Sequence, residues 1–479
     1  MKRLLIANRG EIAVRIARTA REMGIRTVAV HSEVDADALH VRVMDEAVAI
    51  GPAEPARSYL DIAAILRAAR DTGSDAVHPG YGFLSENAGF AQAVLDAGLT
   101  WVGPPPAAMA ALGDKLAGRR AALAAGVPVV PGTTTRDPAV IAALGFPLLV
   151  KASGGGGGRG MRVVSAEAEL GAALASAEAE AASAFGDPTV YAERLLLRPR
   201  HVEVQILGDQ HGHVYALGER ECSIQRRHQK LVEESPCVAL DDVQRRALHE
   251  AAVRLARAAG YTGAGTVEFL LDEGGAFYFL EVNARLQVEH PVTELCCGVD
   301  LVRDQLRVAM GEALDPPPAP RGHAIECRII AENPAAGFVP SPGRLTRVRW
   351  PMGPGVRVDA GVGEGDTVSM HYDALLAKII VFAPDRDAAR RRMLRALEDT
   401  VLVGVGNTVE FLHDVLATAT FTRGELSTDF LDRHFMDWQP PLVGAEVALA
   451  AWLAAPTRLE QAGAPVAALR SPWDTLGRT

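Results

Sequence analysis

The sequence predicts an α/β protein of several domains, and three observations carry that prediction. Near the N-terminus, apolar runs at 4–7 and 27–30 flank a segment with helical apolar spacing at 11–23, which gives a β–α–β order. Further along, five consecutive glycines lie between two short apolar strands. A third region, 266–282, has the pattern of two apolar strands joined by a glycine-bearing turn. With 479 residues and 48% hydrophobic content, the chain can hold about two to four domains.

The composition of the chain indicates which partners it can bind and in which cellular compartment it is expected. The formal net charge of −10 argues against nucleic acid as a main partner, because no overall basic field exists to attract phosphate backbones. No signal segment and no apolar run of membrane-spanning length is visible, so we expect a soluble, cytoplasmic protein without a membrane partner. The cysteines lack a Cys-x-x-Cys pair, which fits a reducing cytosol and neither a disulfide framework nor a zinc site; they are Cys222, Cys237, Cys296, Cys297 and Cys327.

The first predicted domain is a doubly wound sheet. Its first turn, Ala-Asn-Arg-Gly at 7–10, lacks the G-x-G-x-x-G pattern, which argues against a dinucleotide site. A second glycine-bearing loop, 78–87, follows a predicted strand and carries Glu86. The Gly-Pro-Pro-Pro run at 103–106 marks the break to the second domain, whose first helix begins near Lys115.

The five-glycine run predicts a nucleotide site. It follows a predicted strand that ends in Lys151, and a strand at 161–164 comes soon after it. Backbone N–H groups without side chains around them can wrap a polyphosphate, although the run is not a Walker A motif because Gly-Lys-Ser/Thr is absent. A flexible linker is the alternative. The position between two tight strands favours a mobile lid over a nucleotide.

Basic residues concentrate after a predicted strand at 201–207. Alternation along that strand places His201, Glu203 and Gln205 on one face. In an acidic protein, the downstream cluster predicts an anion site, with a solvated basic loop as the alternative. Its members are Arg220, Arg226, Arg227, His228 and Lys230.

The hairpin at 266–282 brings two acidic side chains together. Folding it symmetrically about Gly274–Gly275 sets Glu268 opposite Glu281, and like charges across a ladder are destabilising. A divalent cation between them, Mg²⁺ or Mn²⁺, would remove the conflict, with Asn283 as a further oxygen ligand. A register shifted by one residue, with one carboxylate in solvent, is the alternative.

Polar residues follow the second strand of this hairpin at close spacing. Arg285, Gln287, Glu289 and His290 all occur within six residues. A surface loop could carry such residues, but beside two acidic ligands they predict an anion pocket next to a metal.

The third predicted domain begins after the prolines at 316–318 and 320. Its first strand, 323–330, places Glu326 and Arg328 on one face. From residue 439 the chain is rich in alanine and proline, which predicts a tail or a linker.

The segment Glu-Val-Asn-Ala-Arg-Leu-Gln-Val-Glu-His at 281–290 resembles the signature of biotin carboxylases, which belong to the ATP-grasp superfamily. Further motifs of that family follow in the expected order over roughly residues 1–436, and two mild departures, at 374–376 and 403–408, do not touch the expected chemistry. The resemblance implies a Rossmann-like N-terminal domain without a dinucleotide (1–112), an ATP-grasp domain (113–320) with its lid at about 130–195, an α+β C-terminal domain (321–438), and a tail or linker toward a following domain (439–479).

The resemblance also implies roles for the site residues. Glu289 would deprotonate bicarbonate and Arg328 would stabilise the biotin enolate, and with Arg285 and Lys230 they would form the catalytic set. The implied ligands are Glu268, Glu281 and Asn283 for the metal; Lys230, Arg285, Gln287 and Val288 for bicarbonate; and Lys115, Lys151, Gly157, Gly158, Glu193, Leu196, His201, Gln225 and His228 for ATP.

The implied activity is ATP- and bicarbonate-dependent carboxylation of biotin N1′ via carboxyphosphate, the first half-reaction of an acyl-CoA carboxylase. No Ala-Met-Lys-Met attachment motif occurs in the sequence, so biotin is expected on a separate carrier domain or chain. A carboxyltransferase subunit is a further expected partner, and the family implies a homodimer or a larger assembly. The rival interpretations are another ATP-grasp ligase, which makes an acyl phosphate for an amine, and a nucleotide-binding module without activity. The segment 285–289, together with Lys230 and Arg328, favours biotin carboxylation.

Overall fold

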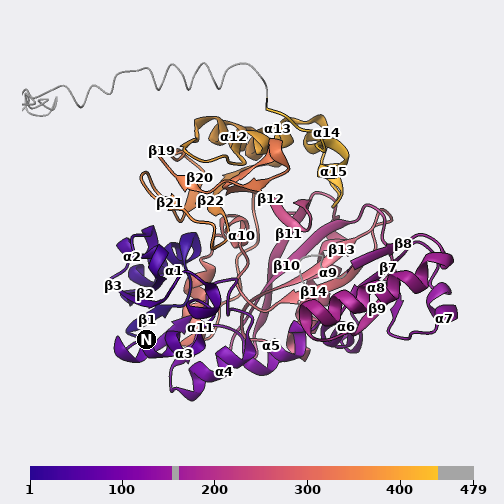
Figure 1. Ribbon diagram of the computed structural model, residues 1–479, viewed down its shortest axis with the longest axis horizontal. Helices are drawn as coiled ribbons and strands as arrows, with labels where there is room; N and C mark the ends of the chain where they lie inside the picture. The colour runs from indigo at the N-terminus through magenta and orange to yellow at the C-terminus, as the bar shows by residue number, and fades with distance from the viewer. Residues whose placement is uncertain (154–160, 441–479) are drawn as a thin grey trace, which may run out of the picture. The chain divides into compact units, whose positions relative to one another are not determined.

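The computed structural model describes residues 1–153 and 161–440 (Figure 1). Residues Met1–Trp438 form one compact unit and Gln439–Thr479 form a second. The predicted glycine run, with Gly157 and Gly158, and the predicted tail beyond residue 440 lie outside the described residues. No helix in the described ranges is long and apolar enough to cross a membrane.

The first part of the chain is a doubly wound α/β unit, as predicted. Its strands are β1 (Arg3–Ile6), β2 (Arg26–Ser32), β3 (Glu46–Gly51), β4 (Ala76–His78) and β5 (Thr100–Trp101), and its helices are α1 (Gly10–Glu22), α2 (Leu39–Val43), α3 (Ile62–Asp71) and α4 (Ala88–Asp96). The strands pair in parallel in the order β3-β2-β1-β4-β5. Helix α1 forms where the sequence has helical apolar spacing, and its Ile12, Ile16 and Ala20 are buried. Asp61 and Asn87 cap the next two long helices through their side chains.

One antiparallel sheet of eight strands runs through the rest of the compact unit. Its strands are β10 (Arg200–Gly208), β11 (Val214–Arg226), β12 (Gln229–Ser235), β13 (Gly263–Leu271), β14 (Phe277–Asn283), β15 (His323–Ile330), β20 (Val356–Ala360) and β22 (Leu375–Ala383). They pair in the order β14-β13-β10-β11-β12-β15-β22-β20. Because β12 pairs with β15, the sheet continues across the predicted boundary between residues 320 and 321. The domain boundaries stay a prediction.

A four-stranded sheet forms a separate layer with its own core. Its strands are β6 (Gly132–Thr133), β7 (Leu148–Ala152), β8 (Met161–Val164) and β9 (Val190–Arg194), in the order β6-β9-β7-β8. Helices α7 (Pro138–Ala142) and α8 (Glu167–Phe185) accompany this sheet (Figure 1). The alanines of α8 allow close packing, because Ala177 and Ala181 are buried against Val150 and Val164.

Among the remaining elements, helices cover the large sheet, and short strands pair with one another as β16-β17, β18-β21 and β19-β23. Helix α9 (Asp242–Ala258) packs on β10 and β11, and α12 (Arg386–Asp399) packs on β15 and β22. The other helices are α5 (Pro106–Gly113), α6 (Lys115–Ala124), α10 (His290–Cys297), α11 (Leu301–Ala309), α13 (Val409–Ala417), α14 (Ala419–Thr422) and α15 (Phe430–His434). The short strands are β16 (Glu332–Asn333), β17 (Val339–Pro340), β18 (Gly343–Arg344), β19 (Arg347–Arg349), β21 (Thr367–Val368) and β23 (Val401–Val403).

Candidate active site

One cavity of about 1230 Å³ gathers almost every predicted site residue. Its walls come from the four-stranded sheet, from the eight-stranded sheet and from loops of the first part of the chain, including Tyr81. Glu289 is fully buried behind this wall, in contact with Lys230. The predicted residues that line the cavity are Lys115, Lys151, Glu193, Leu196, His201, Gln225, His228, Lys230, Glu268, Glu281, Asn283, Arg285, Gln287, Val288 and Arg328.

Three carboxylates form a row across neighbouring strands of the large sheet. Glu203 on β10 lies opposite Glu268 on β13, which in turn lies opposite Glu281 on β14. The predicted pairing of Glu268 with Glu281 is therefore confirmed. This pairing depends on a β-bulge. Nearer the turn, the paired residues are symmetric about Gly274, which alone would not place Glu268 opposite Glu281. Leu280 is an extra residue in β14, and it shifts the following pairs into the predicted register.

The ammonium group of Lys230 lies among three carboxylates. Its Nζ donates to Glu203 Oε2 at 2.5 Å, to Glu289 Oε1 at 2.7 Å and to Glu268 Oε1 at 2.8 Å. Burial alone would lower the pKa of Lys230, but the three carboxylates outweigh burial and hold that pKa well above its ordinary value. A lysine has three donors, so Lys230 can bind a substrate anion only by exchanging one of these partners.

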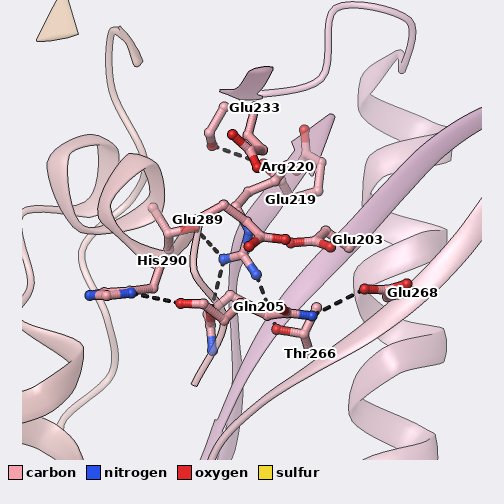
Figure 2. A network of polar contacts seen from close by, with 12 residues as sticks. Glu203, Gln205, Glu219, Arg220, Glu233, Thr266, Glu268, Glu289 and His290 are labelled. Carbon is pink, nitrogen blue, oxygen red and sulfur yellow. Dashed lines mark hydrogen bonds and ion pairs between the residues drawn. The ribbon is translucent and has the colours of Figure 1, made fainter. Parts of the chain in front are cut away.

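Arg220 neutralises the same carboxylate row and is fully buried. Figure 2 shows its guanidinium group among side chains of the sheet. Its Nε donates to Glu203 Oε1 at 2.5 Å, and its Nη1 donates at 2.8 Å to both Gln205 Oε1 and Thr293 Oγ1. Its Nη2 donates to Thr266 Oγ1 at 3.0 Å. These partners occupy the guanidinium group, so Arg220 supports the site and does not face a substrate.

Only some residues of the predicted basic cluster face the cavity, and the others contact protein groups. Arg226 turns away, because its guanidinium group lies 3.7 Å from Glu332 and 4.3 Å from the ring centre of Phe338. Arg227 and His228, like Lys230, line the cavity.

Glu289 is held between two cations. Its Oε1 accepts from Lys230, and its Oε2 accepts from Arg328 Nη2 at 3.0 Å. Burial alone would raise the pKa of Glu289, but Lys230 and Arg328 hold that pKa well below its ordinary range. Arg328 Nε also donates to Glu233 Oε1 at 2.5 Å. Glu233 belongs to no motif, and only the pairing of β12 with β15 reveals its place in the site.

Residues 285–289 form the loop predicted to bind bicarbonate. Arg285 donates through Nη1 to Gln287 Oε1 at 2.8 Å and through Nη2 to Asn283 Oδ1 at 3.0 Å. Its Nε lies 3.2 Å from Glu86 Oε2, so the glycine-bearing loop of the first domain reaches this part of the cavity.

The predicted metal ligands have unequal environments. Glu281 makes no side-chain hydrogen bond or ion pair within the described residues, and burial, followed by the charge of Glu268, raises its pKa. Asn283 donates through Nδ2 to Glu268 Oε1 at 2.8 Å. Donor atoms of His201, Glu203 and Glu268 also lie within 4.8 Å of one another. Adjacent carboxylates are the oxygen donors that a hard divalent cation takes, so the buried Glu268 and the half-buried Glu281 fit such an ion.

The opposite end of the cavity carries cations with few partners. Lys151 forms an ion pair with Glu193, the side chain expected to contact the purine. Lys115 and His228 have neither an ion pair nor a side-chain hydrogen bond in the part of the chain that the structure describes. Burial lowers the pKa of both groups, and Lys151 adds to that effect at each of them. Lys115, a cation without a counter-charge in the described residues, suits a polyphosphate. His228, whose lowered pKa favours the neutral ring, can offer the same ligand an N–H donor.

His201 and Gln225 connect the two ends. His201 Nε2 lies 2.9 Å from Glu268 Oε2, and its Nδ1 lies 3.2 Å from Gln225 Nε2. Leu196 follows strand β9 and contributes apolar surface to the same wall, where a flat base could pack.

Three family models match the chain. They are described as biotin carboxylase, N-terminal domain (residues 1–109), carbamoyl-phosphate synthase L chain, ATP binding domain (114–316), and biotin carboxylase C-terminal domain (326–433). The biotin carboxylase of Nostoc sp. is 49% identical over 438 residues, which cover 90% of this chain and 98% of that protein. The biotin carboxylase 1 of Bacillus subtilis is 48% identical over 444 residues, which cover 91% of this chain and 99% of that protein.

A solved structure has the same fold. It is the biotin carboxylase domain dimer of the Hydrogenobacter thermophilus 2-oxoglutarate carboxylase, in complex with ADP, magnesium and bicarbonate. The TM-score is 0.88 at 42% identity, and the match covers 92% of this chain and 99% of that one.

Proposed function

Because the chain belongs to the biotin carboxylase family, we propose that its cavity carries out the ATP- and bicarbonate-dependent carboxylation of biotin N1′. The fold is that of an ATP-grasp enzyme. The observation that carries the proposal is the placement of Glu289 between Lys230 and Arg328, next to the row of carboxylates in the same cavity.

ATP binds at the end of the cavity where Lys115, Lys151 and His228 lie, and these side chains contact its phosphates. In the described residues Lys115 and His228 have no carboxylate partner, and Lys151 has one, Glu193, whereas Lys230 has three. The purine lies on the wall formed by Glu193 and Leu196. His201 and Gln225 are the further ATP contacts, together with Gly157 and Gly158 of the glycine run.

Glu268 and Glu281 hold Mg²⁺ or Mn²⁺, with Asn283 next to them. When bound, the metal neutralises charge on the transferring phosphoryl group. Glu281 supplies a carboxylate with no competing hydrogen bond in the described residues, whereas Glu268 exchanges its contact with Lys230.

Bicarbonate binds to the loop 285–289, where Arg285, Gln287 and the Val288 N–H surround it, with Lys230 opposite. Glu289 removes its proton so that it attacks the γ-phosphate and forms carboxyphosphate. Paired with two cations, Glu289 is a weak base, and it strengthens when Lys230 and Arg328 turn to the substrate anions. Carboxyphosphate breaks down to CO₂ and phosphate, the phosphate takes the proton from biotin N1′, and Arg328 stabilises the resulting enolate while its N1′ attacks the CO₂.

Biotin reaches the cavity on a separate carrier domain or chain, and a carboxyltransferase passes the carboxyl group to the final acceptor. The acceptor is an acyl-CoA in the predicted pathway. We further propose that the protein acts as a homodimer or larger assembly in the cytoplasm, where its five unpaired, buried cysteines remain reduced.

The test is phosphate release from ATP by the purified protein. We expect release that requires bicarbonate and increases when free biotin is added. Release that requires an amine in place of biotin would assign the chain to another ATP-grasp reaction. ATP binding without any turnover would assign it a role as a nucleotide-binding module.

A further inference from the structure

Two buried donors hold the loop 285–289 from the side away from the cavity. His290 Nδ1 is 2.7 Å from the carbonyl oxygen of Gln287, and Lys378 Nζ donates to the carbonyl oxygen of Val288 at 2.7 Å. A carbonyl can only accept, so Nδ1 of His290 carries the proton. Both side chains are fully buried and neither lines the cavity, whereas Gln287 and Val288 do.

The direction of these two carbonyls sets the direction of two N–H groups. In a trans peptide the N–H points opposite to the C=O. The Gln287 carbonyl shares its peptide with the Val288 N–H, and the Val288 carbonyl shares its peptide with the Glu289 N–H. Neither N–H donates to an acceptor within residues 1–153 or 161–440. Both are therefore directed away from His290 and Lys378, and no acceptor in the described part of the chain competes for them.

Lys378 is itself fixed from another part of the chain. Its Nζ lies 3.2 Å from Glu11 Oε1, and Glu11 also accepts from the hydroxyl of Tyr81. Lys378 lies on β22, whereas Glu11 lies on α1, which belongs to the first domain. The side chains that hold the loop thus come from elements 367 residues apart in sequence.

His290 has the protonation state that this geometry needs. Burial, followed by the charges of Lys378, Arg15 and Arg357, lowers its pKa well below the ordinary value. A neutral ring that donates through Nδ1 leaves Nε2 without a proton, and Nε2 has no hydrogen-bond partner among the described residues.

We propose that His290 and Lys378 are positioning residues of the bicarbonate site: they orient the peptides of Gln287, Val288 and Glu289 so that two N–H groups point at the bound anion. Glu11 fixes Lys378 for this task. The inference rests on the proposed function, since it assigns the orientation of the loop to which bicarbonate binds. It differs from a purely structural role, in which the same contacts would stabilise the fold without affecting the anion.

The test uses a matched pair at His290. In His290→Asn, the side-chain amide nitrogen takes the place of Nδ1 and keeps a donor, whereas His290→Leu removes the donor. In His290→Leu we expect the KM for bicarbonate to rise roughly tenfold, with the KM for ATP unchanged, because one hydrogen bond to the loop is lost. His290→Asn should recover most of the bicarbonate KM.

Lys378→Met combined with Glu11→Gln is the second variant, because the double change removes the donor without leaving a buried charge unpaired. It should raise the bicarbonate KM roughly tenfold as well. Arg386→Met is the matched control. It also removes a cation from a buried carboxylate, Glu234, which Arg386 contacts at 2.7 and 3.0 Å away from the loop. It should lower the Tm and leave both KM values unchanged.

The inference is overturned if His290→Leu and the double variant lower the Tm without changing the bicarbonate KM, or if they raise both KM values equally. If one of them does not fold, the other decides. Failure of the proposed function is a different result, because the wild type itself would then show no bicarbonate-dependent release of phosphate.

Discussion

The two ends of the cavity differ in how their charges are satisfied. At the paired end, cations lie within hydrogen-bond distance of carboxylates, as Lys230 does with three of them. At the unpaired end, the side chains have neither an ion pair nor a hydrogen bond within the described part of the chain. The paired end comprises Glu203, Lys230, Glu233, Glu289 and Arg328, and the unpaired end comprises Lys115, His228 and Glu281.

The pKa directions follow this division only in part. For Lys230 and Glu289 at the paired end, neighbouring charges outweigh burial, so the pKa of Lys230 is raised, that of Glu289 is lowered, and both groups keep their charge. Burial still raises the pKa of Glu203, and it raises that of Glu233 to about 7. At the unpaired end, burial lowers the pKa of Lys115 and raises that of Glu281, toward the neutral forms. Lys115 and Glu281 are half-buried charges without a protein partner in the described residues, which is costly. We propose that the phosphates of ATP and their cation compensate these two charges, whereas protein groups compensate Lys230 and Glu289.

Glu289→Gln breaks the paired end at its centre and has the largest expected effect. The amide keeps the shape of the side chain but cannot accept the bicarbonate proton. We expect bicarbonate-dependent ATP cleavage to fall by about 10²- to 10⁴-fold, the range for loss of a general base. The Kd for ATP should stay nearly unchanged, because Glu289 lies at the other end. Phosphate release and calorimetric ATP binding measure the two quantities, and near-wild-type turnover would remove Glu289 from the mechanism.

Removing a lysine from each end compares the two directly. Lys230→Met leaves Glu203, Glu268 and Glu289 buried without their common cation, so we expect the free energy of unfolding to fall by about 3–5 kcal/mol. Lys115→Met removes no ion pair seen in the described residues, so its stability should hardly change. The Kd for ATP should instead rise about tenfold or more. Urea unfolding with ATP binding measures both, and an equal loss of stability in the two variants would contradict the distinction.

Much of the paired end could be predicted, because strand alternation is a local signal. Alternation placed His201 and Glu203 on one face, and folding the hairpin placed Glu268 opposite Glu281. The predicted pairing of Glu268 with Glu281 is correct only because two deviations from the predicted hairpin cancel each other. The turn is centred on one glycine instead of between two, and the bulge at Leu280, for which the sequence has no signal, corrects the register.

The order of strands could not be predicted, because it depends on contacts between distant segments. Arg220 looked like part of an anion site, yet Thr293, 73 residues further on, contributes to its burial among protein acceptors. Glu233 and Lys378 reach the site only because β12, β15 and β22 are neighbours in the sheet. The doubly wound first domain was predictable for the opposite reason, since its strands and helices alternate along the chain.

Arg328→Ala removes the guanidinium group that we propose stabilises the biotin enolate. We expect carboxylation of free biotin to fall about 10²-fold, because a charge-stabilising group is lost from the position where the enolate forms. ATP binding should be spared, as in the Glu289 variant. Carboxybiotin formation measures the effect, with the Kd for ATP as the internal control. Retained carboxylation would show that Arg328 does not act on the enolate.

The smallest expected effect is a change in the free energy of unfolding, and it concerns Glu326, which faces Glu233 of the paired end. Glu233 lies opposite Glu326 in the ladder and receives Arg328, whereas both oxygens of Glu326 are buried without a hydrogen-bond partner in the described residues. Burial raises the pKa of Glu326 well above its ordinary value; Lys378 and Arg328 oppose that rise, and Glu233 and Glu289 add to it.

A raised carboxyl pKa means that the folded protein keeps a proton which the unfolded chain loses above about pH 4.3. The contribution of Glu326 to the free energy of unfolding is therefore complete below that pH. It is lost as the pH rises through the pKa that Glu326 has in the folded protein. Glu326→Gln mimics the protonated form at every pH. We expect it to match the wild type near pH 4 and to be more stable by about 1 kcal/mol or more near pH 8. Urea unfolding at the two pH values measures this difference. A stability difference that does not grow with pH would mean that Glu326 has a partner for its charge, and that the contrast with Glu233 is not real.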